Sequence, residues 1–317
     1  TYHTYHQDAE SSGDDEIALL KNTSEGLSVI AHGLDWSAGD NVVIPAGEFP
    51  SNRIVWESLS RYGVEVRTID CRVGDDPETV LLSAFDARTR LLSVSSVQFD
   101  TGLRLHLRRL GLGCEAAQVL FCVDAIQSLG ALPLDVRDIR ADFVVADGHK
   151  WLFAAEGLAL FYCRRELLDR LRLNQYGWHM TAAPHDFDRR DWAVAPSARR
   201  FECGSPNMLG IHVLNASVGL LEELGSDQVA EKVLQNAGYL LEHLGGRSDD
   251  FALLTPPDPV RHAGIVSVRP RSADVHELHR RLTAAGVVCA VRSGALRFSP
   301  HYYTPQAHLE RALELLA

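Results

Sequence analysis

The sequence predicts an α/β fold, in which a mainly parallel sheet is flanked by helices and followed by a smaller α+β domain. Short apolar runs alternate with helical stretches from Ile17 onward. Most runs are continuous rather than alternating, which is typical of strands buried on both faces. The repetition of strand, helix and strand favours parallel pairing through crossover helices.

The first two thirds of the chain contain the predicted sheet. Strands are expected at 17–20, 41–44, 64–69, 90–97, 118–123, 142–146 and 158–163. Helices are expected at 24–33, after an Asn-Thr-Ser-Glu cap, at 51–61, after Pro-Ser-Asn, and at 105–117. Residues 170–205 show little periodicity and predict a long connecting or lid segment.

The last third predicts the smaller domain. Helices are expected at 208–224, at 227–244 and near 274–285, and strands at 265–270, 286–292 and 295–300. The expected organisation is therefore a weakly ordered arm or remnant at 1–16, a large domain over 17–205 and a small domain over 206–317.

Charge and composition exclude several classes of protein. There are 31 Lys and Arg against 42 Asp and Glu, a net charge of −11, and 46% of the residues are hydrophobic. This is the composition of a folded globular protein, and its negative charge disfavours nucleic-acid or anionic-membrane binding. The apolar runs are too short to span a bilayer and no signal peptide is visible, so the cytoplasm is the expected location. The six cysteines contain no CxxC pair, and no metal site is expected.

Polar residues follow two of the predicted strands at the point where each strand ends. Asp124 to Gln127 follow the strand at 118–123, and Asp147 to Lys150 follow the strand at 142–146. In open parallel sheets, ligands bind beyond the carboxyl ends of strands. We therefore expect these two segments to face one pocket.

Lys150 is the candidate nucleophile. A lysine after a buried strand, followed by Trp151-Leu152-Phe153, would be partly desolvated and able to form a Schiff base. The alternative is a surface lysine at a strand end. Asp124 favours the first interpretation, because a carboxylate can keep a pyridinium nitrogen protonated, and this makes pyridoxal phosphate an electron sink.

A phosphate site is expected if pyridoxal phosphate binds. The segment 22–26 (Asn-Thr-Ser-Glu-Gly) follows a strand and opens a helix, so that amide groups, hydroxyls and the helix dipole can meet a phosphate there. Taken alone, the segment is also a helix capping box.

Four ordered motifs resemble the class V aminotransferase family, in the branch of cysteine desulfurases and isopenicillin N epimerase-like enzymes. They are Asp-Ala-Ile-Gln at 124–127, Gly-His-Lys at 148–150, Glu-Gly at 156–157, and Phe-Glu-Cys-Gly-Ser-Pro-Asn at 201–207. The resemblance extends from about Ile17 to the end of the chain. It implies the pyridoxal phosphate fold type I, with the seven-stranded type of sheet.

The resemblance implies a role for each matching residue around the cofactor ring. Lys150 would carry the cofactor as a Schiff base, Asp124 would bind the pyridine nitrogen, and Gln127 would donate a hydrogen bond to the phenolic oxygen. Phe49 stands where desulfurases usually stack a histidine on the ring, and a phenyl ring can stack but cannot exchange protons.

The resemblance also implies residues for the phosphate and the substrate. Thr23 and Ser24 would hold the phosphate, with His149 beside it. Ser205 would reach the phosphate of a neighbouring subunit, which implies a homodimer with shared sites. Arg297 would bind the substrate α-carboxylate, a role suited to its bidentate fork, and Arg292 is a second anchor or a plain surface arginine.

Three departures from the desulfurase pattern lie outside the ring. Asp147 replaces a hydroxyl residue ahead of Gly-His-Lys. Only four residues separate Arg292 from Arg297, so the loop that carries a desulfurase's attacking cysteine is missing. Cys289 lies before this segment, where a core thiol is expected. Only 21 residues precede Asn22, which favours a shortened amino-terminal arm.

These observations predict a pyridoxal phosphate-dependent enzyme that acts on an α-amino acid, as an aminotransferase or a C–S/β-lyase. The alternatives are an amino-acid epimerase, a desulfurase-like enzyme, or a cofactor-binding partner protein without turnover.

Overall fold

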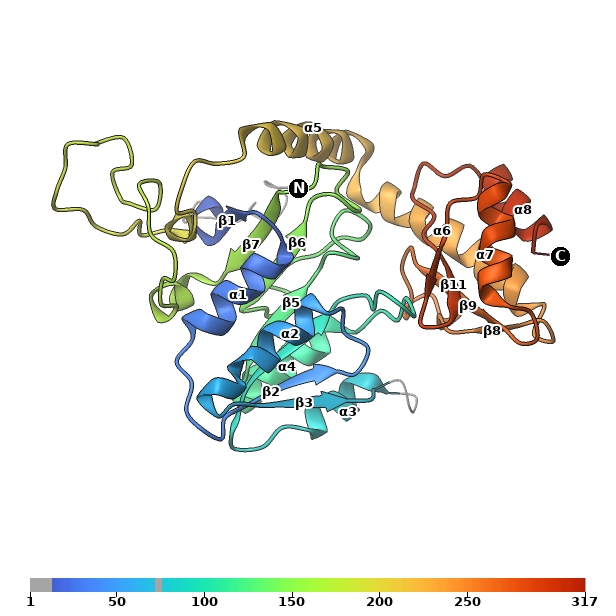
Figure 1. Ribbon diagram of the computed structural model, residues 1–317, viewed down its shortest axis with the longest axis horizontal. Helices are drawn as coiled ribbons and strands as arrows, with labels where there is room; N and C mark the ends of the chain where they lie inside the picture. Colours follow the sequence, from blue (N-terminus) through green and yellow to red (C-terminus); the bar gives the residue numbers. More distant parts are fainter. Residues whose placement is uncertain (1–12, 72–75, 317) are drawn as a thin grey trace. The chain divides into compact units, whose positions relative to one another are not determined.

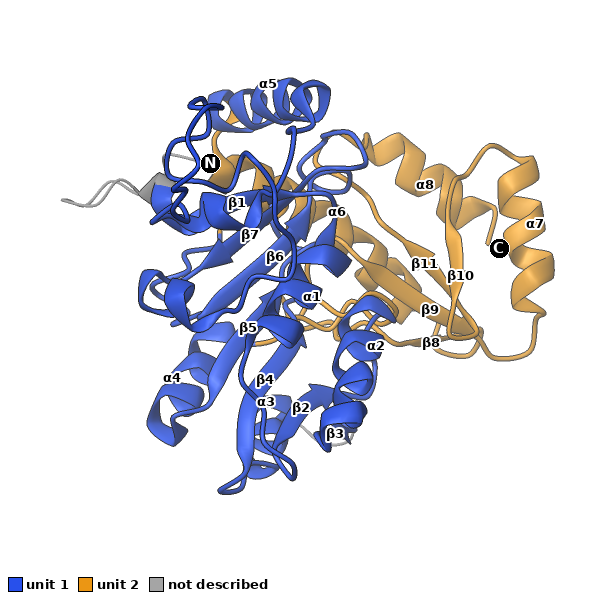
Figure 2. Cartoon of the chain, turned by 60° about the vertical axis from the view of Figure 1, so that its left-hand side comes forward, with its two compact units in different colours: residues 1–96, 106–129, 134–223 blue, residues 97–105, 130–133, 224–317 orange. Residues whose placement is uncertain are grey.

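The chain forms two compact units in the computed structural model, which describes residues 13–71 and 76–316 (Figures 1 and 2). The large unit holds the described residues up to 96 together with 106–129 and 134–223. The small unit holds 97–105, 130–133 and the chain from 224 onward. Two short segments after the strands of the large unit therefore belong to the small one.

The large unit is built on a seven-stranded sheet in the order β1-β7-β6-β5-β4-β2-β3. The strands from β6 to β3 pair in parallel, whereas β7 pairs antiparallel with both β6 and β1, so β7 runs against the other strands of this sheet. The predicted mainly parallel sheet is confirmed. The strands are β1 (Ile17–Leu20), β2 (Asn41–Pro45), β3 (Glu65–Ile69), β4 (Thr89–Ser95), β5 (Leu120–Asp124), β6 (Phe143–Asp147) and β7 (Ala159–Cys163).

Helices flank this sheet in the large unit (Figure 1). They are α1 (Thr23–Gly33), α2 (Ser51–Glu57), α3 (Pro77–Ser83), α4 (Leu107–Ala117) and α5 (Met208–Leu224), with 3₁₀ turns at Gly13–Glu16, Ser58–Tyr62, Arg165–Arg170 and Ala198–Phe201. Leu27 and Ile30 of α1 and Trp56 of α2 are fully buried in one core cluster with Val42 and Ile44 of β2. Burial of these apolar side chains holds both helices on the sheet.

Glycine allows the closest approach between α1 and the sheet. A Cβ added to Gly26 would lie 2.7 Å from Cγ1 of Val145 in β6. Since real Cβ atoms do not approach other atoms so closely, the hydrogen of glycine is required here. The amino end of α1 is thereby held beside the carboxyl end of β6.

The small unit contains a four-stranded antiparallel sheet in the order β10-β11-β9-β8. Leu240 and Leu244 of α6 pack on Val266 and Val268 of β9 and on Leu296 of β11 in a second core cluster. The elements are α6 (Ser226–Gly245), β8 (Phe251–Leu253), β9 (Val266–Pro270), α7 (Val275–Ala284), β10 (Ala290–Arg292), β11 (Ala295–Phe298) and α8 (Gln306–Glu314).

Several expectations differ from the structure. The boundary between the large and the small unit lies at 223/224 and not at the expected 205/206, because most of α5 belongs to the large unit. The expected arm at 1–16 lies outside the described residues up to residue 12, while 13–16 form a 3₁₀ turn in which a Glu16 oxygen accepts the Arg165 amide at 2.7 Å. The helix expected at 51–61 ends as α2 at Glu57 and continues as a 3₁₀ turn. The sequence prediction omitted α3, β8 and α8.

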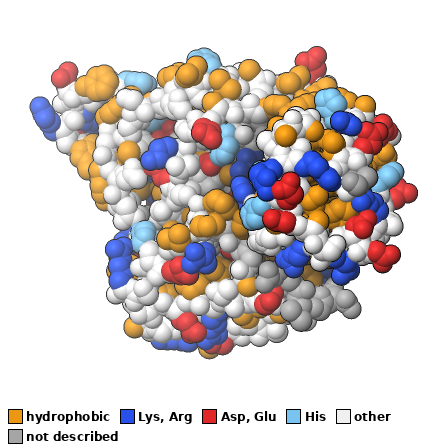
Figure 3. Space-filling model, turned by 45° about the vertical axis from the view of Figure 1, so that its right-hand side comes forward, with side chains coloured by type: hydrophobic (Ala, Val, Ile, Leu, Met, Phe, Trp, Pro, Cys, Tyr) orange, Lys and Arg blue, Asp and Glu red, His pale blue; other side chains and the backbone are white. Residues whose placement is uncertain are grey.

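The described residues also bear on membrane and nucleic-acid binding. None of the helices in the described part of the chain is both long enough and apolar enough to cross a bilayer. Acidic and basic side chains are interspersed on the face drawn in Figure 3. That face therefore offers no broad basic surface for a phosphate backbone.

Candidate active site

Most of the predicted site residues lie where strands of the large unit end. Lys150 follows β6, Asp124 ends β5, Phe49 lies between β2 and α2, and Thr23 opens α1 just after β1. The carboxyl ends of these strands share one edge of the sheet, where ligands bind in folds of this type. The large unit thus brings together residues that are up to 127 positions apart.

Lys150 is presented by a closed turn after β6. The Gly148 amide donates to the carbonyl of Leu158 at 2.9 Å, and the Ala154 amide donates to the carbonyl of Gly148 at 2.8 Å. Lys150 is half-buried, and its Nζ lies 5.7 Å from the centre of the Phe49 ring. An ammonium group over an aromatic face at this distance makes a cation–π contact. Phe49 therefore lies over the lysine, where a stacking ring is expected.

Asp124 is a buried acid, with a residue exposure of 2%. The pKa of Asp124 is raised to about 7. Burial is the main cause and the negative charge of Glu48 contributes, while the hydrogen bond from the Ile126 amide and the charge of Lys150 offset part of the rise. Among the described residues, its carboxylate accepts one hydrogen bond, from the Ile126 amide at 3.0 Å. A carboxylate in this environment is stabilised by a cationic ligand group, which fits a pyridinium nitrogen.

A hydrogen-bond network that the sequence analysis missed surrounds Glu48. This buried carboxylate accepts from the amide and the hydroxyl of Ser95 at 2.7 and 2.5 Å, and from the Asn52 amide at 2.9 Å. The Asn52 oxygen in turn accepts from Ser93 Oγ at 2.6 Å and from Trp56 Nε1 at 3.0 Å. Through this network, the turn that contains Phe49 is bound to the end of β4.

Gln127 is held by a second residue that the sequence analysis did not assign. Its Oε1 accepts a hydrogen bond from Trp151 Nε1 at 3.2 Å, and both side chains are buried. Trp151 directly follows Lys150, so the same turn positions the lysine and the partner of Gln127.

The expected phosphate residues cluster around Asp147. An Asp147 oxygen accepts the Thr23 amide at 2.7 Å, and Thr23 Oγ1 accepts the Asp147 amide at 3.1 Å. His149 Nδ1 lies 3.7 Å from the other Asp147 oxygen. Burial raises the pKa of Asp147, whereas the Thr23 hydrogen bond and the charges of His149 and Lys150 lower it. Asp147 therefore accepts an amide at the amino end of α1, where Asn22 is the N-cap. Ser24 is exposed in the same turn, and its hydroxyl donates to Ser51 Oγ at 2.8 Å.

Ser205 is not joined to these residues within the chain. It is exposed, and no hydrogen bond or ion pair links it to the other predicted site residues in the described ranges.

Arg297 lies on β11 of the small unit and is half-buried. Its Nη1 donates to the carbonyl of Phe99 at 2.7 Å, and its buried Nε finds no hydrogen-bond partner within the described chain. Burial lowers the pKa of Arg297, the nearby charge of Arg292 lowers it further, and Asp100 raises it. One edge of the guanidinium is thus fixed by the protein, and the edge that contains Nε can bind a carboxylate.

The segment between the two arginines is a tight hairpin. Arg292 pairs with Ala295 across a two-residue turn, in which Ser293 and Gly294 have φ angles of 49° and 73°. Two residues with positive φ are typical of a type I′ turn. Cys289 lies before this hairpin and is half-buried, and burial raises the pKa of its thiol. The chain between 292 and 297 thus consists of this two-residue turn and the start of β11.

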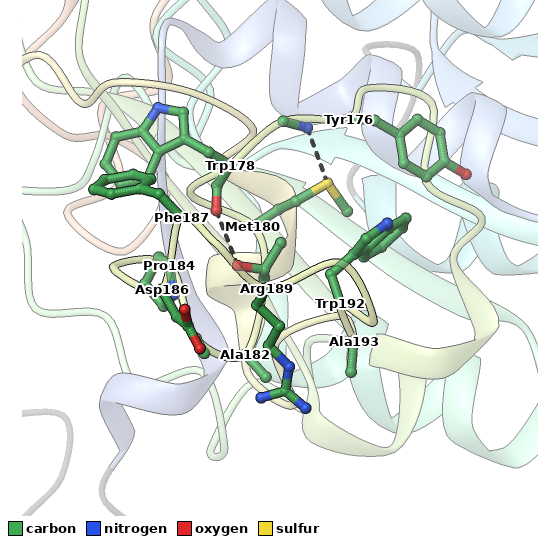
Figure 4. A pocket seen from close by; sticks show the side chains of 13 residues that line it. Tyr176, Trp178, Met180, Ala182, Pro184, Asp186, Phe187, Arg189, Trp192 and Ala193 are labelled. Carbon is green, nitrogen blue, oxygen red and sulfur yellow. Dashed lines mark hydrogen bonds between the residues drawn. The ribbon is translucent and has the colours of Figure 1, made fainter.

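The expected lid segment carries an aromatic pocket of about 420 Å³ (Figure 4). Trp178 and Phe187 lie side by side there, with ring centroids 5.9 Å apart, and Trp192 and Tyr176 line another part of it. None of the predicted site residues lines this pocket. The candidate active site is therefore the group of polar residues at the edge of the sheet, and not this pocket.

The residues of the large unit fit pyridoxal phosphate. Lys150 would supply the amine, buried Asp124 the acid for the ring nitrogen, and Gln127 an amide fixed by Trp151. Phe49 supplies a ring face above the lysine. The fit to the phosphate group is less complete, because the Thr23 amide already donates its hydrogen bond to Asp147.

Comparison with known proteins places the chain in a family. The profile of the aminotransferase class-V family matches residues 9–308. A probable cysteine desulfurase of Methanothermobacter thermautotrophicus is 28% identical over 96% of this chain and 80% of its own length. An uncharacterized aminotransferase of Bacillus subtilis is 27% identical over 96% of this chain and 79% of its own length.

Two solved structures share the fold. The apo cysteine desulfurase of Thermococcus onnurineus superposes with a TM-score of 0.85 at 24% identity, over 95% of this chain and 78% of that one. The cystine C-S lyase C-DES, in complex with its product cysteine persulfide, superposes with a TM-score of 0.87 at 24% identity, over 95% and 81% of the two chains. The fold type and the pyridoxal phosphate-dependent enzyme class expected from the sequence are confirmed, and this chain belongs to the aminotransferase class-V family.

Proposed function

We propose that this protein uses pyridoxal phosphate on Lys150 to convert an α-amino acid, as an aminotransferase or a C–S/β-lyase. One observation carries the proposal: Lys150 lies against the Phe49 ring and within electrostatic reach of the buried Asp124, whose pKa is about 7. An amine, a stacking ring and a buried acid at one sheet edge are the groups that this cofactor requires.

Each residue has a defined task in this proposal. Bound pyridoxal phosphate supplies an electron sink for the carbanion at Cα. Asp124 holds the proton on the ring nitrogen, Gln127 donates to the phenolic oxygen, and Phe49 stacks on the ring. Lys150 Nζ takes the proton from Cα, since the ring above it has no group that can exchange one.

The phosphate and the substrate are held by further residues. Ser24 and Thr23 at the amino end of α1 bind the phosphate, with His149 beside it. Arg297 binds the substrate carboxylate through the edge that Phe99 leaves free, and Arg292 is a second anchor. Ser205 reaches the phosphate of the partner subunit in a homodimer.

The hairpin at 292–297 favours these reactions over persulfide formation on the enzyme. A cysteine that attacks substrate sulfur must reach the reacting atom as a thiolate. Cys289 is half-buried before β10, and burial raises the pKa of its thiol.

The expected cytoplasmic location stays a proposal, supported by six unpaired cysteines.

Replacement of Lys150 by Ala tests the cofactor attachment. We expect the wild-type protein to bind pyridoxal phosphate with a visible band and to retain the cofactor covalently after borohydride reduction, and we expect Lys150→Ala to lose this attachment. Lys232→Ala, in α6 of the small unit, is the matched control. Borohydride attachment that persists in Lys150→Ala contradicts the assignment.

A screen of amino acids separates the reactions. Each amino acid is tested for a change of the visible band, and the product is then identified by mass. A keto acid that retains the carbon skeleton indicates transamination, and pyruvate with a released thiol indicates β-elimination. An inverted amino acid, or no spectral response to any amino acid, contradicts the proposal in favour of an epimerase or a non-catalytic protein.

A further inference from the structure

Trp151 donates a hydrogen bond to a residue at the end of the neighbouring strand. Its indole Nε1 lies 3.2 Å from Gln127 Oε1. The exposed fractions are 4% for Trp151 and 6% for Gln127, so water does not compete freely for this bond. Trp151 comes from the turn after β6 and Gln127 from the turn after β5.

The chemistry of the two groups fixes the orientation of the amide. An indole N–H can donate but cannot accept, whereas a glutamine side chain has an accepting oxygen and a donating NH₂ group. The oxygen must therefore face the indole. The opposite orientation would set two donors against each other in a buried place and leave both without an acceptor, which is unfavourable.

The fixed oxygen determines what Gln127 offers to the site. With Oε1 bound to the indole, Nε2 points away from Trp151 and carries two hydrogens. Its complement is a hydrogen-bond acceptor, preferably an anionic oxygen. A serine or water partner in place of Trp151 could either donate or accept, and would leave the amide free to present its oxygen.

We propose that Trp151 is a positioning residue, whose indole N–H locks the Gln127 amide as a donor toward the phenolic oxygen of the cofactor on Lys150. This inference rests on the proposed function. It assigns a role to the residue after the reactive lysine: the turn that carries the amine also sets the polarity of the group opposite the phenolic oxygen.

A spectroscopic pH titration tests the proposal. A donor to the phenolic oxygen competes with the proton that this oxygen shares with the Schiff-base nitrogen, so loss of the donor raises the midpoint of the visible band. For Trp151→Phe in the reconstituted holoenzyme we expect a rise of about 0.5 to 1 pH unit, the size of one ordinary hydrogen bond. An unchanged midpoint overturns the proposal.

A double-mutant cycle distinguishes positioning from a general structural effect. Gln127→Leu is expected to raise the midpoint by at least as much, and Trp151→Phe added to Gln127→Leu should cause no further change. If the shift caused by Trp151→Phe persists in the Gln127→Leu background, Trp151 does not act through Gln127. Trp36→Phe is the matched control, since its indole donates to the Ala31 carbonyl at 2.7 Å, beyond the far end of α1.

A second substitution covers a failure of Trp151→Phe to fold. Benzothienylalanine at position 151 keeps the bicyclic ring and replaces N–H by sulfur, and the same rise of the midpoint is expected. A wild-type protein without borohydride-fixed cofactor on Lys150 overturns the proposed function itself. A wild-type protein with that cofactor, but with equal midpoints in the wild type and both variants, overturns only the role of Trp151.

Discussion

The buried carboxylate of Asp124 binds a proton more tightly than an aspartate in water does. Its pKa is about 7 in the folded protein, against an ordinary value of 3.8. Between these two values, the folded state keeps the proton and the unfolded chain releases it. The contribution of Asp124 to the free energy of unfolding is therefore complete below pH 4 and is lost as the pH rises toward 7.

Substitution of Asp124 by Asn removes this dependence. In cofactor-free protein, we expect Asp124→Asn to flatten the decline in the free energy of unfolding between pH 4.5 and 7, by up to roughly 3 kcal/mol. Urea denaturation at a series of pH values measures it. Asp138→Asn, at an exposed acid of the same unit, should leave the slope unchanged. Equal slopes for wild type and Asp124→Asn would show that the acid is not buried as described.

Asp147 and the cofactor phosphate compete for the same amide. Because its carboxylate accepts the Thr23 amide and lies 3.7 Å from His149, it adds negative charge to the expected phosphate site. We expect Asp147→Asn to tighten cofactor binding about tenfold, since loss of one charge of repulsion is worth about 1.4 kcal/mol. Equilibrium dialysis against pyridoxal phosphate measures the Kd. Weaker binding would show that Asp147 supports the phosphate site.

The sequence predicted these residues to different degrees. Lys150, Asp124 and Gln127 follow buried strands, and local sequence was enough to mark them. Glu48 and Trp151 were missed, because their roles depend on contacts with Ser95 and Gln127, which come from other strand ends. No spacing along one segment reports such contacts. Asp147 was noticed as unusual, but only the structure shows that it accepts the Thr23 amide in the first turn of α1.

At the scale of elements, α1 packs closely on β6 because Gly26 has no side chain. A Cβ on Gly26 would lie 2.7 Å from Val145 Cγ1. We expect Gly26→Ala to destabilise the protein by about 1 to 3 kcal/mol, although alanine favours helices, because overpacking outweighs helix propensity. Urea denaturation of the purified variant measures the effect.

Gly219→Ala is the matched control for this substitution. Gly219 lies within α5 of the same unit, and an added Cβ meets nothing within 4 Å. Alanine should therefore stabilise this helix by up to about 1 kcal/mol. If both substitutions stabilised the protein, α1 and β6 would not be in close contact.

Elements with long apolar runs were predicted best. The strands from β1 to β7 agree with the expected ranges to within about two residues. Most of them are apolar runs buried in the sheet, whereas β3 is partly exposed. The omitted elements are short or poorly marked: β8 has three residues, and α3 has seven. For α8 a signal existed, because Leu309 and Ala312 are spaced as one buried helix face after Pro305.

At the scale of the whole molecule, a shared site makes two defective chains complement each other. Each site of the proposed homodimer takes Lys150 from one subunit and Ser205 from its partner. We expect Lys150→Ala and Ser205→Glu proteins to be inactive alone, because the second places a carboxylate against the phosphate. After the subunits are mixed and exchanged, roughly a quarter of the wild-type activity should return, since half of the dimers are mixed and each holds one intact site.

The experiment includes its own control. Lys150→Ala mixed with the double variant Lys150→Ala/Ser205→Glu has no intact site in any combination and should stay inactive. An active Ser205→Glu homodimer, or no recovery after demonstrated subunit exchange, would contradict the shared site.

The two-residue turn between β10 and β11 affects where a product can go. The turn is too short to carry a thiol on a flexible loop that moves between the reaction centre and an acceptor protein. If the substrate carries sulfur, the freed atom departs as a small diffusing molecule and not on a tethered arm. Its capture then depends on the nucleophiles and scavengers of the surrounding medium, so delivery to a chosen recipient would require a separate carrier.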